Sequence, residues 1–115
     1  MSSVDAAEAG SDTPRMTESN LRGKQRRYLR GLGVNLEPSV FVGKEGLSPA
    51  LLTALDHELN DRELVKVRLL DSAGDRKAMA RELAERAKVE LIQVLGRTAL
   101  LYRRNEEEPQ IELPE

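Results

Sequence analysis

The stretch Gly43–Gly46, with the sequence GKEG, carries the residue types in this chain that most clearly indicate binding chemistry. It follows an apolar run and precedes Ser48 and Pro49, which are typical of a helix N-terminus. Glycines leave backbone N–H groups uncovered, and a helix N-terminus adds unpaired N–H groups and the positive end of its dipole. Such a loop attracts phosphate: Lys44 adds positive charge, whereas Glu45 should point away from an anion. The alternative is that the glycines only turn a strand into a helix.

The charges of the chain are divided unevenly along its length. Residues 1–19 carry a net charge of -3, with four acidic residues against Arg15, and residues 105–115 carry -5, all from glutamates. Between them, residues 20–104 contain 17 Lys and Arg against 11 Asp and Glu, a net charge of +6. A basic centre between acidic ends favours a polyanionic partner over an ordinary solvated surface.

No catalytic constellation is visible in the sequence. The absence of cysteine excludes disulfides and thiolate chemistry and is typical of a cytoplasmic protein. His57 is the only histidine, and the glycine loop matches neither G-x-x-x-x-G-K-[ST] nor G-x-G-x-x-G. We therefore predict a protein that is not an enzyme and binds no metal or cofactor. The acidic residues around residue 60 are interpreted as solvated carboxylates: Asp56, Glu58, Asp61 and Glu63.

Hydrophobic periodicity predicts the elements that must position the loop. In order, they are a helix capped by Ser19 and ending near Gly31 and Gly33, a buried strand at 39–42, a helix from Ser48 to about 60, a strand at 63–70, a helix ending near 87, and a hairpin of 89–95 with 98–103. This order predicts an α/β domain, α-β-α-β-α-β-β, with a small mixed four-stranded sheet and packed helices. Residues 71–75 are expected to supply the turn and the cap before the third helix.

One domain is expected at 19–104, because a chain of 115 residues has room for little more than a single core. The polar composition of residues 1–18 predicts a disordered acidic arm, and residues 105–115 are read as a similar tail. No apolar run approaches the length of a membrane span.

Basic residues recur on two of the predicted elements. In the first helix, Arg22, Arg26 and Arg30 follow one another at four-residue spacing along one flank. In the strand at 63–70, Lys66 and Arg68 alternate with valines and so lie on its wet face. We expect these residues and the glycine loop to form one continuous basic surface.

The aromatic residues decide how such a surface would bind nucleic acid. Tyr28 and Phe41 fall in apolar patterns and are predicted to lie in the core, which leaves no aromatic pair to stack bases. Recognition of the phosphate backbone is therefore favoured over reading of bases.

Four blocks, LRGKQRRYLRGLG, VGKEGLSPALL, ELVKVRLL and VLGRTALLYRR, in this order and spacing, resemble the bacterial YhbY family, the single-domain form of the CRM (chloroplast RNA splicing and ribosome maturation) domain. The resemblance covers about residues 20–104. It implies a fold similar to the carboxy-terminal domain of translation initiation factor three. It also implies an RNA-binding protein associated with precursors of the large ribosomal subunit.

The hypothesis from sequence is a module that binds ribosomal precursor RNA and assists assembly of the large subunit. Its predicted RNA-binding residues are Gly43, Lys44, Glu45, Gly46, Arg22, Lys24, Arg26, Arg27, Arg30, Lys66, Arg68 and Arg97. The alternative hypothesis is a protein-interaction adaptor whose basic face docks an acidic partner. The oligomeric state, the RNA segment and any inhibitory role of the acidic ends stay open.

Overall fold

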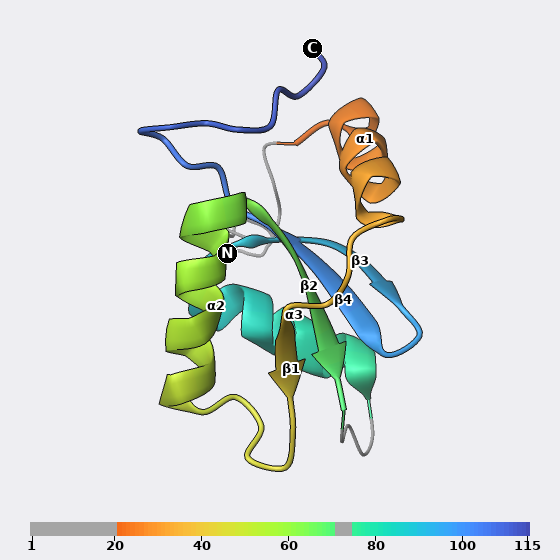
Figure 1. Ribbon diagram of the computed structural model, residues 1–115. Coiled ribbons are helices and arrows are strands. Elements are labelled where there is room, and N and C mark those ends of the chain that lie inside the picture. Colours follow the sequence, from red (N-terminus) through yellow and green to blue (C-terminus); the bar gives the residue numbers. More distant parts are fainter. Residues whose placement is uncertain (1–20, 71–74) are drawn as a thin grey trace, which may run out of the picture.

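The computed structural model describes residues 21–70 and 75–115, and it confirms the predicted α-β-α-β-α-β-β order (Figure 1). The elements are α1 (Gly23–Gly33), β1 (Val40–Val42), α2 (Pro49–Arg62), β2 (Leu64–Leu69), α3 (Arg76–Ala87), β3 (Glu90–Leu95) and β4 (Thr98–Tyr102). The predicted N-terminal arm, the Ser19 cap and most of the turn at 71–75 lie outside the described residues.

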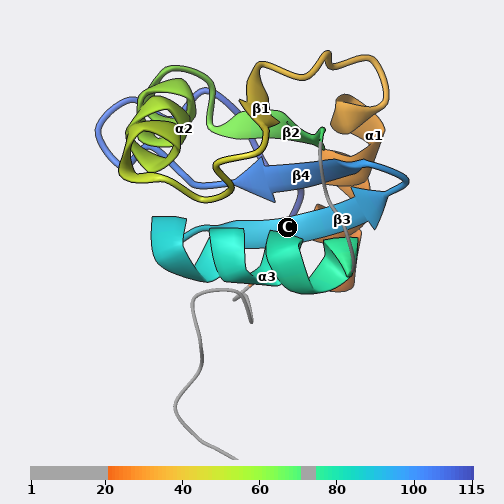
Figure 2. The same ribbon diagram turned by 90° about the horizontal axis from the view of Figure 1, so that it is seen from below.

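The four strands form one mixed sheet in the order β1-β2-β4-β3 (Figure 2). β1 and β2 pair in parallel, as expected for strands joined by a helical crossover. β4 pairs antiparallel with β2 on one side and with β3 on the other. β2 and β3 therefore run in the same direction without touching, because the last strand of the chain lies between them.

One face of the sheet carries the larger part of the core and is covered by α2 and α3. Alternation in β2 places Val65, Val67 and Leu69 on this face, where none of them is exposed. The side chains that pack against them include Leu55, Leu59, Leu83 and Ala84. The helices bury these leucines at three- and four-residue spacing, as the periodicity predicted.

The opposite face is only partly covered, by α1. Leu29 is fully buried there against Leu64, Leu100 and Tyr102. The end of α1 approaches β4 closely: a Cβ added at Gly33 would lie 2.7 Å from a methyl carbon of Leu100. Glycine therefore allows this contact, and the part of the sheet beyond α1 remains open.

α1 begins later than predicted. Its first residue is Gly23, with Arg22 at the N-cap position, three residues after the predicted cap position. Gln25 accepts a hydrogen bond from the N–H of Arg22 through Oε1 at 2.9 Å, which satisfies one backbone group ahead of the helix. This bond serves the N–H of the N-cap residue, whereas a serine cap would accept from N–H groups of the first turn.

The segment after β4 packs on the domain instead of forming a disordered tail. Ile111 and Leu113 join the apolar cluster around Leu29. The end of the segment lies beside α1, where Gln25 Nε2 donates to the carbonyl of Pro114 at 2.9 Å. The disordered reading of residues 105–115 is therefore wrong, because two apolar side chains and several hydrogen bonds dock a segment of acidic composition.

Glu63 holds this segment in place, and its interpretation as a solvated carboxylate is wrong. It is fully buried at the C-terminus of α2, with a φ of 66°. Its two carboxylate oxygens accept hydrogen bonds from the N–H groups of Asn105 (2.7 Å), Gln110 (2.9 Å) and Ile111 (2.7 Å). Its carbonyl oxygen also accepts from Arg103 N at 2.9 Å. One acidic side chain thus fixes the path of the chain after β4.

The pKa of Tyr102 provides a test of this packing, because it makes the stability of the domain depend on pH. Burial, and then the nearby Glu63 carboxylate, raise the pKa of Tyr102 above its usual value, although Arg104 opposes the rise. An unfolded chain releases the phenol proton at about pH 10, whereas the folded chain keeps it to higher pH. The free energy of unfolding should therefore fall as the pH rises above about 10.

The Tyr102→Phe variant should lose the part of the alkaline destabilisation that comes from ionisation of the Tyr102 phenol. At pH 7 its stability should change by less than about 1 kcal/mol, because the buried hydroxyl has no hydrogen-bond partner among the described residues. Denaturant unfolding of both proteins at pH 7 and at about pH 11 measures the difference. An equal alkaline loss in the variant would show that another group causes it.

Candidate nucleic-acid interface

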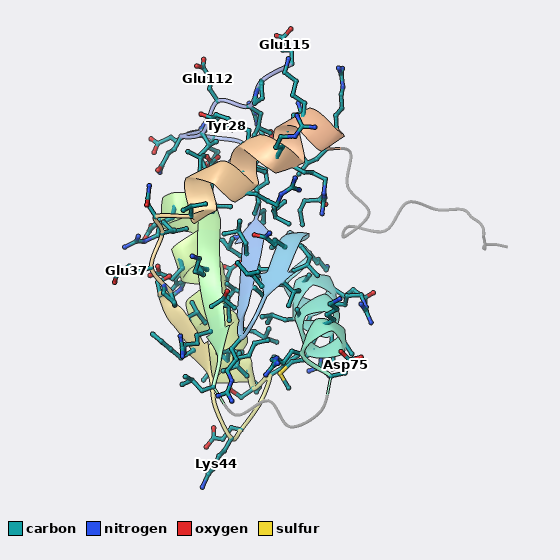
Figure 3. The ribbon with its side chains drawn as sticks, turned by 90° about the vertical axis from the view of Figure 1, so that its right-hand side faces the viewer. Tyr28, Glu37, Lys44, Asp75, Glu112 and Glu115 are labelled. Atoms are coloured by element: carbon teal, nitrogen blue, oxygen red, sulfur yellow. The ribbon has the colours of Figure 1, made fainter. Side chains whose placement is uncertain are left out.

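The glycine loop is a tight turn directly after β1. The N–H of Gly46 donates to the carbonyl of Gly43 at 3.0 Å, and Gly46 has a φ of 65°, which glycine adopts without strain. Lys44 is exposed and points away from the rest of the molecule at the lower end of Figure 3. A Cβ added at Gly43 would meet no atom within 4 Å. The backbone of this turn is therefore open to a ligand.

α2 begins directly after the loop, with the predicted cap. Ser48 Oγ accepts from the N–H of Leu51 at 3.1 Å, and Pro49 is the first helical residue. The positive end of the helix dipole consequently lies beside the turn. A depression of about 500 Å³ extends over both, and its lining includes Phe41 and Lys44.

The basic face of β2 has the predicted orientation. Lys66 and Arg68 alternate with Val65 and Val67 and project from the face opposite α2 and α3. Lys66 is half-buried, and it lines a pocket of about 160 Å³ together with Arg30 of α1. Arg68 lies farther from α1 and is exposed.

Strand register places Arg68 in a row that crosses the whole sheet. It pairs with Phe41 of β1 on one side and with Thr98 of β4 on the other, and Thr98 pairs with Leu95 of β3. This row and the two cations next to it are called the open sheet face below; its residues are Phe41, Arg68, Thr98, Leu95, Lys66 and Arg30. In Figure 3 the strands lie between α1 at the upper end and the loop with Lys44 at the lower end.

Other predicted cations of α1 contact protein groups. Arg26 is half-buried, and its Nη2 donates to the carbonyl of Leu91 in β3 at 2.6 Å. Lys24 Nζ donates to the carbonyl of Glu115 at 3.1 Å. Arg26 therefore ties α1 to β3, and Lys24 ties α1 to the C-terminal segment. Arg30 is the cation that α1 contributes to the open sheet face.

The remaining predicted cations, Arg22, Arg27 and Arg97, are exposed. Arg22 precedes α1, and Arg27 lies on its surface. Arg97 occupies the predicted hairpin turn after Gly96, which has a φ of 60°. Its carbonyl accepts the N–H of Leu69 at 2.7 Å, so this turn lies at the same end of β2 as Arg68.

The aromatic residues lie where the sequence interpretation did not place them. Phe41 is 50% exposed and Tyr28 is 42% exposed, so the prediction that both belong to the core is wrong. Val40 and Val42 take the buried side of β1, and alternation then turns Phe41 outward. In α1 the buried position belongs to Leu29, which turns the adjacent Tyr28 away. The alternation of VFV was the available signal for Phe41.

Within residues 21–70 and 75–115, no group of three or more His, Asp or Glu side chains is placed to hold a metal ion. His57 is exposed on α2. In the same described ranges, no helix combines the length and apolar character needed to cross a membrane. The functional groups gathered on the surface are thus the loop backbone and the cations of the open sheet face.

Two known proteins that are named probable RNA-binding proteins match most of this chain. The probable RNA-binding protein PA4753 of Pseudomonas aeruginosa is 37% identical over 86 residues, which cover 74% of this chain and 83% of the relative. The probable RNA-binding protein YqeI of Bacillus subtilis is 37% identical over 95 residues, which cover 82% of this chain and 99% of the relative.

A solved structure and a family description extend the match to the fold. The solution structure of the hypothetical protein SAV1595 from Staphylococcus aureus, described as a candidate RNA-binding protein, matches with a TM-score of 0.70 and 41% identity. The match covers 82% of this chain and 99% of the SAV1595 chain. The model of the CRS1/YhbY (CRM) domain matches residues 21–103, which is most of the chain. This chain therefore belongs to the CRS1/YhbY (CRM) domain family.

Proposed function

We propose that this protein binds RNA through the glycine loop and the open sheet face, with residues 19–104 as the binding domain. The observation that carries the proposal is the open turn at Gly43–Gly46, which adjoins both a helix N-terminus and, through Phe41, the cations of β2. Uncovered backbone N–H groups and cations are the groups that contact phosphate. Relatives at 37% identity that are named probable RNA-binding proteins support this proposal.

The proposed biological role is to assist assembly of the large ribosomal subunit in the cytoplasm by binding its precursor RNA. The role is one of binding, because glycines and cations neutralise and position phosphate but provide no nucleophile or acid-base pair. Contacts to phosphate should make the affinity depend on salt, with a log-log slope of about -0.7 for each single-strand phosphate contacted. A slope near zero would contradict the proposal.

The loop is tested by the Gly43→Ala variant. If the backbone at Gly43 lies against phosphate, the added methyl group should lower the affinity for a single-stranded RNA by about tenfold. Stability should not fall, because the methyl group meets no atom of the protein within 4 Å. Fluorescence anisotropy with a labelled oligonucleotide measures the affinity, and thermal unfolding measures the stability.

Gly23→Ala is the matched control, since Gly23 is also exposed and also has no atom near an added Cβ. It should bind RNA like the wild type and be slightly more stable, because alanine favours a helix. If Gly43→Ala binds as well as this control, the loop is only a turn between β1 and α2, and RNA binding must rest on the cations alone.

The cellular role is tested by sedimentation of the tagged full chain in lysate gradients. The protein should travel with precursors of the large subunit at low salt and be released by RNase digestion or by high salt. A partner that remains bound after digestion would instead identify the protein as an adaptor for an acidic protein. Absence from every ribosomal fraction would overturn the assembly role.

A further inference from the structure

We propose that Phe41 and Arg68 form a stacking site for an unpaired RNA base on the open sheet face. The inference rests on the proposed RNA-binding function and extends it from the phosphate backbone to the base. Phe41 is 50% exposed on β1, and its register partner Arg68 is exposed on the neighbouring parallel strand. Side chains paired directly across two strands lie on the same face at neighbouring positions.

The composition of the row fits a ligand with a flat apolar part and a negative part. Leu95, at its other end, is 68% exposed, so the row ends in an apolar group on both sides of the sheet. Arg68 and Thr98 lie between these two ends. A nucleotide offers a base that stacks on an aromatic ring or a guanidinium plane, and a phosphate that attracts the cation.

The row is open because α1 stops short of it. α1 covers the end of this face where Leu29 packs on Leu64 and Tyr102, whereas Arg68 and Thr98 lie at the opposite ends of those two strands. An aromatic ring on this uncovered half leaves apolar area in water, which is unfavourable for stability alone. A base that covers Phe41 would remove that area from water.

The stacking site adjoins the proposed phosphate site. Phe41, Gly43 and Lys44 line the same depression of about 500 Å³. On the other side of the row, Arg30 and Lys66 line the pocket of about 160 Å³ together with Leu95 and Thr98. A strand of RNA that crosses the open sheet face would therefore meet cations before and after the base on Phe41, and this charge arrangement favours RNA over an apolar protein segment.

The Phe41→Ala variant tests the site with two RNA probes of equal length, one an ordinary single strand and the other an abasic backbone. Loss of a stacked base should weaken binding to the ordinary strand by about tenfold and leave the salt slope unchanged. Binding to the abasic strand should not change. Phe41→Tyr should restore the wild-type affinity, and Tyr28→Ala, which removes an exposed ring from α1, should have no effect.

A direct readout comes from Phe41→Trp, because the chain contains no tryptophan. Its fluorescence should be quenched by the ordinary strand and not by the abasic strand. If the wild type binds RNA with a normal salt slope but Phe41→Ala binds equally well and Phe41→Trp is not quenched, the stacking site is refuted while the RNA-binding function stands.

Two other outcomes also decide the question. An equal loss of affinity for both probes in Phe41→Ala would mean that Phe41 only supports the loop, which refutes stacking. Failure of the folded wild type to bind either RNA at low salt would refute the proposed function itself, and the exposed row would then fit a protein partner.

Discussion

Replacement of Glu63 by alanine is expected to lower the free energy of unfolding by about 3 kcal/mol and to release the C-terminal segment from α1. The carboxylate accepts three backbone N–H groups, from Asn105, Gln110 and Ile111, at 2.7–2.9 Å. Hydrogen bonds to a charged group contribute roughly 1.5–3 kcal/mol each, but the freed N–H groups regain water once the segment detaches. The net loss should therefore be smaller than the sum of the three bonds.

Glu63→Gln separates the hydrogen bonds from the shape of the side chain. One amide oxygen can still accept from Gln110 and Ile111, whereas the amide NH2 would face the N–H of Asn105. We expect a loss of about 1–2 kcal/mol, with the segment still docked. Glu82→Ala is the control, because it removes a surface i,i+4 pair with Arg86 on α3 and should cost less than about 0.5 kcal/mol.

Denaturant unfolding measures the stabilities, and hydrogen exchange at the amides of Gln110 and Ile111 reports whether the segment is docked. In Glu63→Ala these two amides should exchange much faster than in the wild type, even where the rest of the domain stays folded. If their exchange is unchanged, the apolar contacts of Ile111 and Leu113 hold the segment without Glu63, and the role assigned to the carboxylate is wrong.

Reversal of the two cations of β2, in the double variant Lys66→Glu and Arg68→Glu, is expected to weaken RNA binding by about a hundredfold. The estimate assumes two lost phosphate contacts at about 1.4 kcal/mol each. The salt dependence should also become shallower, by about 1.4 in the log-log slope, since each single-strand contact contributes about 0.7. Anisotropy titrations over a salt series measure both quantities.

The matched control reverses two cations on the other side of the sheet, Lys77 and Arg81, which are exposed on α3. It changes the net charge by the same amount and should alter affinity only through the weaker long-range field. Equal losses in the two double variants would show that binding follows net charge alone and that the open sheet face is not the binding surface. Thermal unfolding of both variants verifies that they fold.

The sequence determined those features whose cause is local. Ser48 and Pro49 start α2 because a side-chain cap and a fixed φ act within one turn. Gly96 closes the hairpin because its φ of 60° suits glycine. Alternation in β2 separates its valines from Lys66 and Arg68, so both the element order and the basic strand face could be predicted.

The tertiary structure decided what depends on contacts between distant residues. Glu63 and Ile111 are far apart in the chain, and no local pattern shows that the carboxylate will be buried by backbone N–H groups. The order of the strands likewise depends on where β4 inserts, between β2 and β3. Arg26 has the spacing of a surface arginine, yet it donates to β3 because α1 packs there.

The exposure of Phe41 has both a local cause and a tertiary one. Its alternation with Val40 and Val42 indicated that it faces away from the valines, but not whether that face would be covered. Coverage depends on the length and position of α1, which reaches one half of the sheet and leaves the other half open. The sequence by itself therefore determined the elements and their charged faces, whereas packing decided which faces meet solvent, because burial is a property of the assembled layers and not of any one segment.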